Sequence, residues 1–283
     1  MQKLFSALLL ITFSCIYSQE KMPYRIFTKD GKVASYDLML KAVVKSEVTL
    51  FGEYHDNSIC HWLELELAKD VTLLRPVVLG AEMIETDNQL ALNKYLNGAI
   101  DQKELDSTAR LWPNYKTDYK PLVDLAKEKQ LPFVATNVPR RYAGMVYKQG
   151  FESLLTLPVE EKSWIATLPI PYDANLPGYV KMVAEMAGHG GENLPKAQAL
   201  KDATMAAFIL KNRLKGSVFI HYNGSYHSDN FDGIYWYLKN AEKKLDIITI
   251  ATVTQEDILT LSKENYNKAN FIIVIDEDVT KTY

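Results

Sequence analysis

Short apolar runs that alternate with longer amphipathic segments are the feature that most restricts the fold of this chain. Each run has the length and composition of a buried strand, and helix-like segments separate most of the runs. Regular alternation of this kind predicts an α/β fold, with a mostly parallel central sheet and helices on both faces. The runs are residues 48–51, 77–81, 133–136, 217–220, 246–253 and 271–275, the last of them expected as an edge strand.

Two segments depart from this alternation. Lys29-Asp30-Gly31 is a turn signal between two short apolar runs, which predicts a hairpin near the N-terminus. Residues 151–195 contain five prolines and show irregular periodicity, with short helices expected around 160–166 and 175–187. This region would bury little apolar surface by itself, so we interpret it as a helical insertion over the sheet.

The first eighteen residues are typical of an export signal. Lys3 gives a basic start, residues 4–13 are apolar but too few to span a bilayer, and small polar residues follow. We expect residues 1–18 to be a signal peptide that is cleaved after Ser18. The alternative is a lipoprotein in which Cys15 is acylated and becomes the new N-terminus, although the residues before Cys15 match that pattern poorly. Either alternative predicts an exported protein.

Composition excludes two classes of protein. The chain has 32 basic and 35 acidic side chains and a net charge of -3, so a basic surface for nucleic acid is not expected. It has only two cysteines, one of them within the export signal, which excludes a disulfide scaffold and a cysteine-based zinc site.

Acidic and imidazole side chains follow three of the predicted core strands. Glu53 and His55 come directly after the first strand, Glu82 follows the second, and His227 lies shortly after the fourth. Parallel α/β sheets bind ligands outside the carboxyl ends of their strands, so we expect these four side chains at one edge of the sheet. Neighbouring polar residues such as Asn57 are explained by helix capping without any chemistry.

The four side chains fit two kinds of chemistry. Carboxylate oxygens and imidazole nitrogens suit a divalent metal ion, and they also suit an acid–base pair. Glu53, His55, Glu82 and His227 are therefore candidate metal ligands and, if the protein is a hydrolase, candidate catalytic residues. His61, about one turn into the following helix, is expected to pack or to lie at the surface.

Aromatic residues indicate a second kind of ligand. The chain has 17 Tyr against 10 Phe. A flat apolar ligand suits aromatic walls, and Tyr, His or Met can bind a haem iron. Core packing explains an individual Tyr equally well. The candidate haem contacts are Tyr115, Tyr179, Met182, Met186 and His189.

Several motifs, in order along the chain, resemble those of the ChaN-like proteins of the Tiki superfamily. The resemblance covers residues 36–275, nearly the whole mature chain. A middle block at residues 112–119 and 131–140 and a helix at residues 197–205 are also similar to the family. The motifs are Gly52-Glu-Tyr-His-Asp56, Gly80-Ala-Glu82-Met and Gly224-Ser-Tyr-His227, the last matching the family's Gly-x-x-His signature.

The resemblance implies a single ChaN-like α/β domain over residues 19–283 that binds haem as its cofactor. It further implies an exported protein, often a lipoprotein, which acts in haem or iron acquisition. Its expected place is the periplasm or a lipid anchor at the outer membrane, with an outer-membrane component of haem uptake as a partner. A flat ring at a surface edge would also permit sharing between two copies of the chain, as in a homodimer.

The wider superfamily implies an alternative. It includes metal-dependent proteases and erythromycin esterases, which use the matching Glu, His and Gly-x-x-His positions for hydrolysis. The alternative function is therefore a metal-dependent hydrolase of peptidase or esterase type, with a divalent ion held by Glu53, His55, Glu82 and His227. The resemblance favours haem binding, whereas the residues alone fit hydrolysis slightly better, so the sequence leaves open whether the protein is an enzyme.

Overall fold

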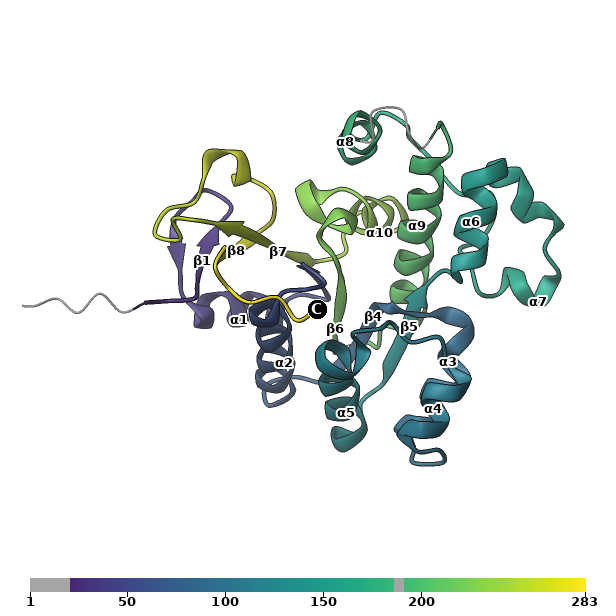
Figure 1. The fold of residues 1–283 in the computed structure, drawn as a ribbon, viewed down its shortest axis with the longest axis horizontal. Helices are drawn as coiled ribbons and strands as arrows, with labels where there is room; N and C mark the ends of the chain where they lie inside the picture. Colours follow the sequence, from purple (N-terminus) through teal and green to yellow (C-terminus); the bar gives the residue numbers. More distant parts are fainter. Residues whose placement is uncertain (1–20, 186–190) are drawn as a thin grey trace, which may run out of the picture.

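A computed structural model describes residues 21–185 and 191–283, and an eight-stranded sheet runs through this part of the chain (Figure 1). The strand order is β2-β1-β8-β7-β3-β6-β4-β5. Neighbours from β8 to β5 are parallel, whereas β1 pairs antiparallel with both β2 and β8. The strands are β1 (Tyr24–Thr28), β2 (Val33–Ala34), β3 (Val48–Glu53), β4 (Val77–Glu85), β5 (Phe133–Asn137), β6 (Val218–Gly224), β7 (Ile247–Gln255) and β8 (Phe271–Asp276).

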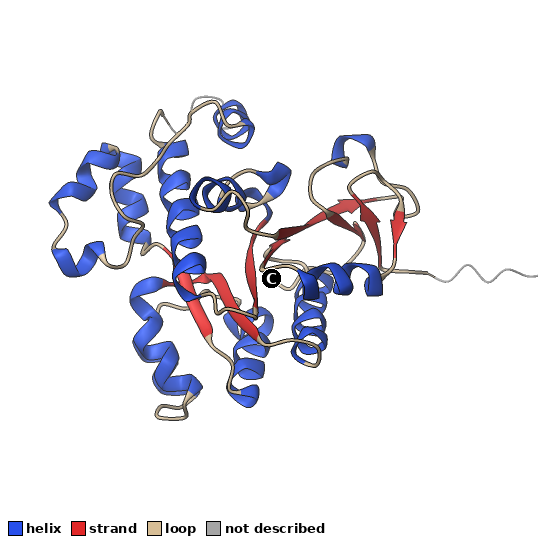
Figure 2. Cartoon of the chain, turned by 180° about the vertical axis from the view of Figure 1, so that it is seen from behind, coloured by secondary structure: helices blue, strands red, loops and turns tan. Residues whose placement is uncertain are grey.

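Helices cover both faces of the sheet (Figures 1 and 2), and the predicted α/β architecture is confirmed. Helices α1 to α5 lie on one face, and α6, α9 and α10 lie on the other. The helices are α1 (Tyr36–Lys45), α2 (Ser58–Thr72), α3 (Gln89–Leu96), α4 (Gln102–Thr108), α5 (Lys120–Lys129), α6 (Arg140–Gln149), α7 (Val159–Lys162), α8 (Pro177–Glu185), α9 (Leu194–Asn212) and α10 (Ile234–Ala241).

Short helical turns connect several of these elements. They are η1 (Thr86–Asn88), η2 (Tyr115–Tyr119), η3 (Phe151–Thr156), η4 (Ser225–His227), η5 (Asp229–Phe231) and η6 (Lys263–Asn265).

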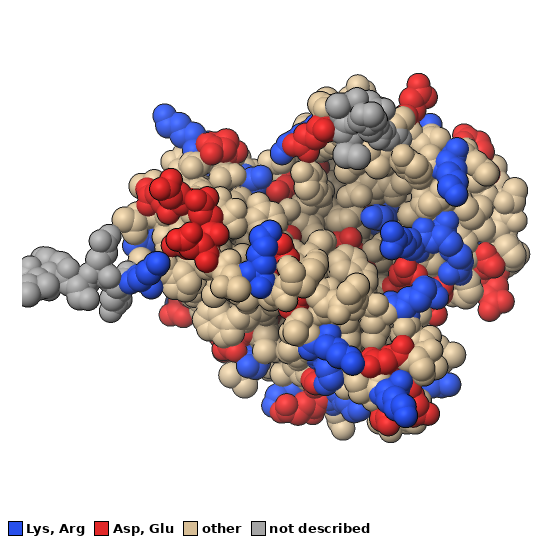
Figure 3. Space-filling view, in the orientation of Figure 1, with Lys and Arg blue, Asp and Glu red and all other residues tan. Residues whose placement is uncertain are grey.

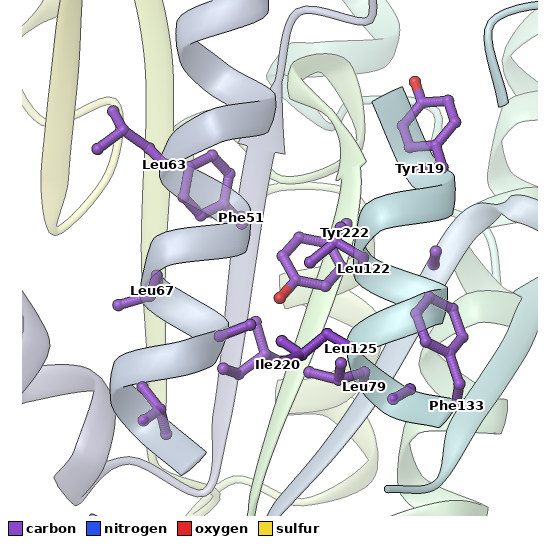
Figure 4. Packing of buried hydrophobic residues seen from close by; sticks show 14 of the residues in the cluster. Phe51, Leu63, Leu67, Leu79, Tyr119, Leu122, Leu125, Phe133, Ile220 and Tyr222 are labelled. Carbon is purple, nitrogen blue, oxygen red and sulfur yellow. The ribbon is translucent and has the colours of Figure 1, made fainter. Parts of the chain in front are cut away.

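Alternation along the central strands divides the core into two layers. Successive side chains of a strand point to opposite faces, and β3 follows this rule. Val48 and Leu50 pack under α6, α9 and α10, whereas Phe51 packs under α2 and α5. Figure 4 shows the second layer, where Phe51 and Leu67 lie between the sheet and α2. A sheet covered on both faces explains why its strands are apolar along their whole length.

One strand is placed differently from the prediction. Residues 271–275 were expected as an edge strand, but β8 lies inside the sheet, between β7 and β1. The expectation was wrong because the N-terminal hairpin, which does form, adds to the free edge of β8 in antiparallel register. Local sequence predicts a hairpin, but it carries no information on which distant strand the hairpin will pair with.

The predicted helical insertion is also present. Its described part contains η3, α7 and α8, and its apolar residues Leu154, Ile165 and Ile170 pack on the layer formed by α6 and α9. Residues 1–18, including Cys15, lie outside the described residues, so the predicted export signal stays a prediction. Within residues 21–185 and 191–283, no helix has the length and apolar character needed to cross a membrane.

Candidate functional site

The sheet order brings the predicted polar side chains to one edge. Strand β6 lies between β3 and β4, so the carboxyl ends of these three parallel strands are adjacent. Glu53 is the last residue of β3, and His227 lies in η4, directly after β6. Glu82 was expected just past its strand, but β4 continues to Glu85 and includes it. The longer strand has an irregular register with β5 beyond Ala81.

Glu53, His55, His61, Glu64 and Tyr119 form a first group of buried or half-buried polar residues, which we call the Glu53 cluster. The Oε1 atom of Glu53 accepts hydrogen bonds from Nδ1 of His55, at 2.6 Å, and from the hydroxyl of Tyr119, at 2.7 Å. Tyr119 lies at the upper end of the apolar layer in Figure 4, with its hydroxyl pointing away from Leu125 and Phe133. Two donors therefore hold one oxygen of a carboxylate that is only 1% exposed.

His61 and Glu64 complete this cluster from helix α2. Nδ1 of His61 lies 3.2 Å from Oε2 of Glu64 and 3.6 Å from Oε2 of Glu53. His61 packs in the interior as expected, with its ring edge-on against Tyr119. Its surroundings were not expected, because Glu53 and Glu64 meet on the same side of α2 and face its Nδ1.

Burial and neighbouring charges shift the pKa values of the two carboxyl groups of the Glu53 cluster in opposite directions. Burial raises the pKa of Glu53, but the hydrogen bond from His55, the nearby imidazoles and the proton of Glu64 together outweigh burial, so the net pKa lies below its ordinary value. Burial and the negative charge of Glu53 both hold the pKa of Glu64 well above its ordinary value. In the protein without a bound cation, Glu53 is therefore ionised and Glu64 holds a proton.

Glu82, Asp202, His227 and Tyr179 form a second group, which we call the His227 cluster. Nε2 of His227 lies 3.1 Å from Oε1 of Glu82, and Nδ1 lies 2.5 Å from Oδ1 of Asp202. The hydroxyl of Tyr179 donates to the other oxygen of Asp202 at 3.1 Å. The backbone N–H of Gly224 donates to Oε2 of Glu82 at 2.8 Å. Each carboxylate is thus held at both oxygens.

The two carboxylates keep His227 protonated. Burial lowers the pKa of His227, but the charges of Glu82 and Asp202 outweigh burial and raise the pKa to about 9. For Glu82 the signs are reversed. Burial raises its pKa, but the charge of His227 and the hydrogen bond to it outweigh burial and hold the pKa below its ordinary value. At neutral pH this histidine is an imidazolium, and both ring nitrogens donate to carboxylates. It has no lone pair with which to bind a metal ion.

Gly224 lies between the two clusters, since its backbone N–H donates to Glu82 and its Cα lies close to the His55 ring. A Cβ atom at this position would lie 2.7 Å from Nε2 of His55. The backbone φ of Gly224 is −57°, so the glycine is not needed for a left-handed turn. The glycine of the Gly-x-x-His motif therefore leaves the space that the His55 ring occupies, and a larger residue would have to displace this ring.

A cavity of about 1080 Å³ opens over both clusters. Figure 3 shows this face hollowed near its centre, with basic side chains grouped beside the hollow. Arg140, Lys201 and Lys281 are the basic residues of the cavity wall. The wall also contains all four predicted metal ligands, together with aromatic residues from separate parts of the chain, namely Tyr54, Trp112 and Tyr226.

The predicted haem contacts are distributed differently. Met182 of α8 lines the cavity. Tyr179 donates to Asp202 from behind the wall, and the buried ring of Tyr115 packs in the layer under α2 and α5, so neither lines the cavity. Met186 and His189 lie outside the described residues.

Four residues of the site escaped sequence reasoning, and two of them have a recognisable signal. Glu64 is an acidic residue on the apolar stripe of α2, in register with Cys60 and Leu67, and His61 precedes it by three positions. Asp202 and Tyr119 lie inside two of the blocks that resemble the family, but no local pattern predicts their contacts, because their partners lie 25 and 66 residues away along the chain.

The four predicted metal ligands do not converge on one point. They form two pairs, Glu53 with His55 and Glu82 with His227. Among the residues that the structure describes, three donors lie within 4.8 Å of one another at a single place, which is Glu53, His61 and Glu64.

Comparison with known proteins places this fold. The family model for haem-binding uptake, Tiki superfamily, ChaN, matches residues 39–238. A structure of ChaN from Campylobacter jejuni, described as showing cofacial haem binding, is 16% identical and has a TM-score of 0.67, covering 89% of this chain and 97% of that chain. No curated protein matches the chain.

Two further solved structures are more distant. The type III effector HopBA1 is 13% identical over 86% of this chain and 93% of its own, with a TM-score of 0.50. The erythromycin esterase EreC is 11% identical, covering 82% of this chain and 77% of its own, with a TM-score of 0.47. At such identities the ChaN and HopBA1 structures show similarity of fold alone. The family match is the stronger finding, because residues 39–238 are more than half of the chain and include the central strands β3 to β6, and by it this chain belongs to the ChaN family of the Tiki superfamily.

Proposed function

We propose that this protein binds haem in the cavity at the carboxyl edge of its sheet. The observation that carries the proposal is the cavity itself, whose volume of about 1080 Å³ lies just above the usual range for ligand pockets, about 300–1,000 Å³, and leaves room for a large ligand. Membership of a haem-binding family supports the same ligand, and so does the haem described for ChaN of Campylobacter jejuni.

The wall chemistry fits a flat ring that bears carboxylates. Trp112 and Tyr226 offer aromatic surface, and Met182 offers a polarisable thioether. Arg140 and Lys201 place positive charge at the same wall, where they would bind the propionate groups of haem. The described wall also carries seven carboxyl groups, so the propionate groups would bind at the places where Arg140, Lys201 and Lys281 lie.

His55 and Tyr226 are the candidate iron ligands. Glu53 accepts the proton of Nδ1 of His55, so in the neutral ring the lone pair is on Nε2, as in carboxylate–histidine pairs at metal sites. Tyr226 is 59% exposed on the cavity rim and its hydroxyl donates to Glu185. His227 is unsuitable, because both of its nitrogens are engaged by carboxylates. Bound haem would supply an iron centre whose ligands come from these side chains.

A hemin titration of the purified protein tests the proposal. We expect a saturable Soret shift at micromolar concentrations with one ring per chain. His55→Gln or Tyr226→Phe should weaken binding about tenfold or more, and the variant that also changes the spectrum identifies the ligand. Tyr147→Phe is the matched control, because Tyr147 is exposed on α6 and does not line the cavity. No saturable shift, or a shift that both cavity variants retain unchanged, would contradict haem binding here.

We further infer that haem binding serves haem or iron acquisition outside the cytoplasm, in the periplasm or at a lipid anchor on the outer membrane. The signal-like residues 1–18 with Cys15 support this. Mass spectrometry of the mature N-terminus tests it, because cleavage after Ser18 and acylation of Cys15 leave different masses. An uncleaved N-terminus in the native host would contradict export. A homodimer sharing the ring, and an outer-membrane uptake component, are the proposed partners.

The His227 cluster favours a hydrolase as the second candidate function. His227 lies at the cavity wall with a pKa of about 9, and a substrate that displaced Glu82 from Nε2 would meet there an imidazolium that serves as a general acid for the leaving group. Hydrolysis of peptide and ester substrates, with and without divalent metal, should then be lost in His227→Gln while the fold survives. An activity that withstands this change would exclude His227 from the chemistry.

A further inference from the structure

We propose that Glu53, His61 and Glu64 form a buried binding site for one divalent transition-metal ion, with Zn²⁺ as the probe. The site lies behind the wall of the cavity and shares only Glu53 with the ligands expected from the sequence. It goes beyond haem binding, because none of its donor atoms except those of Glu53 belongs to a residue that lines the cavity.

The backbone places the three donors without rearrangement. His61 and Glu64 are three residues apart on α2, so their side chains project from the same face of the helix. Glu53 ends the neighbouring strand β3 and faces them. From Nδ1 of His61 the distances are 3.2 Å to Oε2 of Glu64 and 3.6 Å to Oε2 of Glu53. Ligands about 2.0–2.1 Å from a tetrahedral ion lie about 3.3 Å apart, which matches these separations.

The cluster contains more acceptors than donors. Nε2 of His61 lies 3.1 Å from the backbone carbonyl of His55, which only accepts, so Nε2 is a donor, and Nδ1, which faces the carboxylates, is the nitrogen left to bind a metal ion. Within the described residues, Oε2 of Glu53 and Oε1 of Glu64 have no hydrogen-bond partner, although both side chains are fully buried. Such acceptors are costly to bury unless a cation or a proton satisfies them.

Charge favours a divalent cation. No Lys or Arg of the described chain lies within 4.0 Å of Glu53 or Glu64, so only nearby imidazoles and the proton of Glu64 offset the charge of this carboxyl pair. A divalent ion would replace that proton and neutralise both carboxylates. Imidazole nitrogen with carboxylate oxygen suits zinc and its neighbours, whereas Ca²⁺ requires about six to eight oxygen ligands, more than these three side chains supply.

Neighbouring groups already hold the ligands in place. The carbonyl of His55 that fixes the His61 ring also accepts from Nδ2 of Asn114 at 3.0 Å. The other oxygen of Glu53 is held by Tyr119 and His55. Outer hydrogen bonds of this kind orient the ligands of a metal site and set the histidine tautomer.

Metal titration of the chelator-stripped full chain tests the site. We expect elemental analysis after dialysis against Zn²⁺ to find one tightly held ion per chain, and Co²⁺ to give the absorption of a nitrogen- and oxygen-bound ion. Glu64→Gln keeps the shape of the side chain but removes its charge, and it should weaken Zn²⁺ binding about 100-fold in calorimetry. Glu66→Gln is the matched control on the same helix, because Glu66 faces solvent and pairs with Lys69; it should bind Zn²⁺ as the unmodified protein does.

Three results would overturn the proposal. The first is no ion held by the unmodified chain, which would mean that a shared proton satisfies the carboxyl pair; this result does not depend on any variant folding. The second is unchanged affinity in both Glu64→Gln and His61→Gln. The third is an ion lost in His227→Gln but kept in Glu64→Gln, which would place it in the cavity. Hemin titration of the stripped protein reports separately on haem, so the two proposals can fail independently.

Discussion

The Glu53 cluster and the His227 cluster contain the same kinds of residue, but their donors and acceptors balance differently. In the His227 cluster a protonated imidazole lies between two carboxylates, and a tyrosine and a backbone N–H satisfy the remaining oxygens. In the Glu53 cluster a histidine turns Nδ1 toward two carboxyl groups, and two buried oxygens have no partner among the described residues.

This difference assigns the clusters different roles. Buried charges that are fully paired form a rigid structure, and removing one partner leaves the others uncompensated. Buried acceptors without donors need a proton or a cation. We therefore interpret the His227 cluster as a self-sufficient ion network that shapes the cavity wall, and the Glu53 cluster as the part of the site that can take up a cation.

Removing Asp202 should cause the largest loss of stability among the changes that test the difference between the two clusters. Asp202→Ala leaves the His227 imidazolium with one carboxylate and leaves the hydroxyl of Tyr179 without its acceptor. We expect the free energy of unfolding to fall by about 3–5 kcal/mol, as for other buried pairs that lose one partner. Urea unfolding followed by circular dichroism measures it.

A surface acid is the control for that experiment. Glu128→Ala on α5, where the side chain is 71% exposed, should change the free energy of unfolding by less than about 0.5 kcal/mol. If Asp202→Ala cost no more than this control, the His227 cluster would not be a paired ion network.

Alkaline pH should remove the stabilisation that comes from protonated His227, and this loss should be slightly smaller than that in Asp202→Ala. An unfolded histidine titrates near pH 6.5, whereas the pKa of folded His227 is about 9. Between these values the folded chain holds a proton that the unfolded chain lacks, so the stabilisation is complete below about pH 6.5 and is lost as the pH rises through about 9. The shift corresponds to about 3 kcal/mol.

Urea unfolding at intervals between pH 6 and 9.5 measures this loss. His227→Gln should show a much flatter dependence across the same interval, since it lacks the titrating group. Equal slopes in the two proteins would show that other groups cause the loss, and stability that rises with pH would contradict the raised pKa.

The smallest loss of stability among these tests is expected in the Glu53 cluster. Tyr119→Phe keeps the ring, which packs edge-on against His61 and Trp112, and removes only the hydroxyl that donates to Glu53. A hydrogen bond to a charged group contributes about 1.5–3 kcal/mol, so we expect a loss of about 2 kcal/mol in unfolding free energy. Tyr147→Phe on the exposed face of α6 should be neutral. A loss as large as that in Asp202→Ala would mean that both clusters are equally interlocked.

Much of the fold follows from local pattern. The apolar runs before Glu53 and at residues 133–136 became β3 and β5, and Asn57 caps α2 as expected. Asp101 and Glu104, three residues apart, form a capping box at the start of α4. Signals of this kind involve residues within a few positions of each other, so a single sequence contains them completely.

Other features depend on residues that are distant along the chain. Thr86 and Gln89 have the spacing of a capping box, but the box does not form, because the hydroxyl of Thr86 donates to the carbonyl of Trp164 in the insertion. Likewise β8 is not an edge strand, because a hairpin more than 240 residues earlier in the chain pairs with it. Neither partner can be identified from the neighbouring sequence.

The sequence by itself determined the α/β architecture, the edge at which polar side chains would gather, and the family to which their motifs belong. Alternation and strand ends suffice for these, since parallel strands bring their carboxyl ends together. Only the tertiary structure decided which carboxylate faces which imidazole. Glu53 meets Glu64 and His61, whereas Glu82 and Asp202 enclose His227, and these pairings depend on how α2 and α9 pack against the sheet. Charge balance in a buried site is set by contacts a few ångströms long between distant residues, which the order of residues along the chain does not specify.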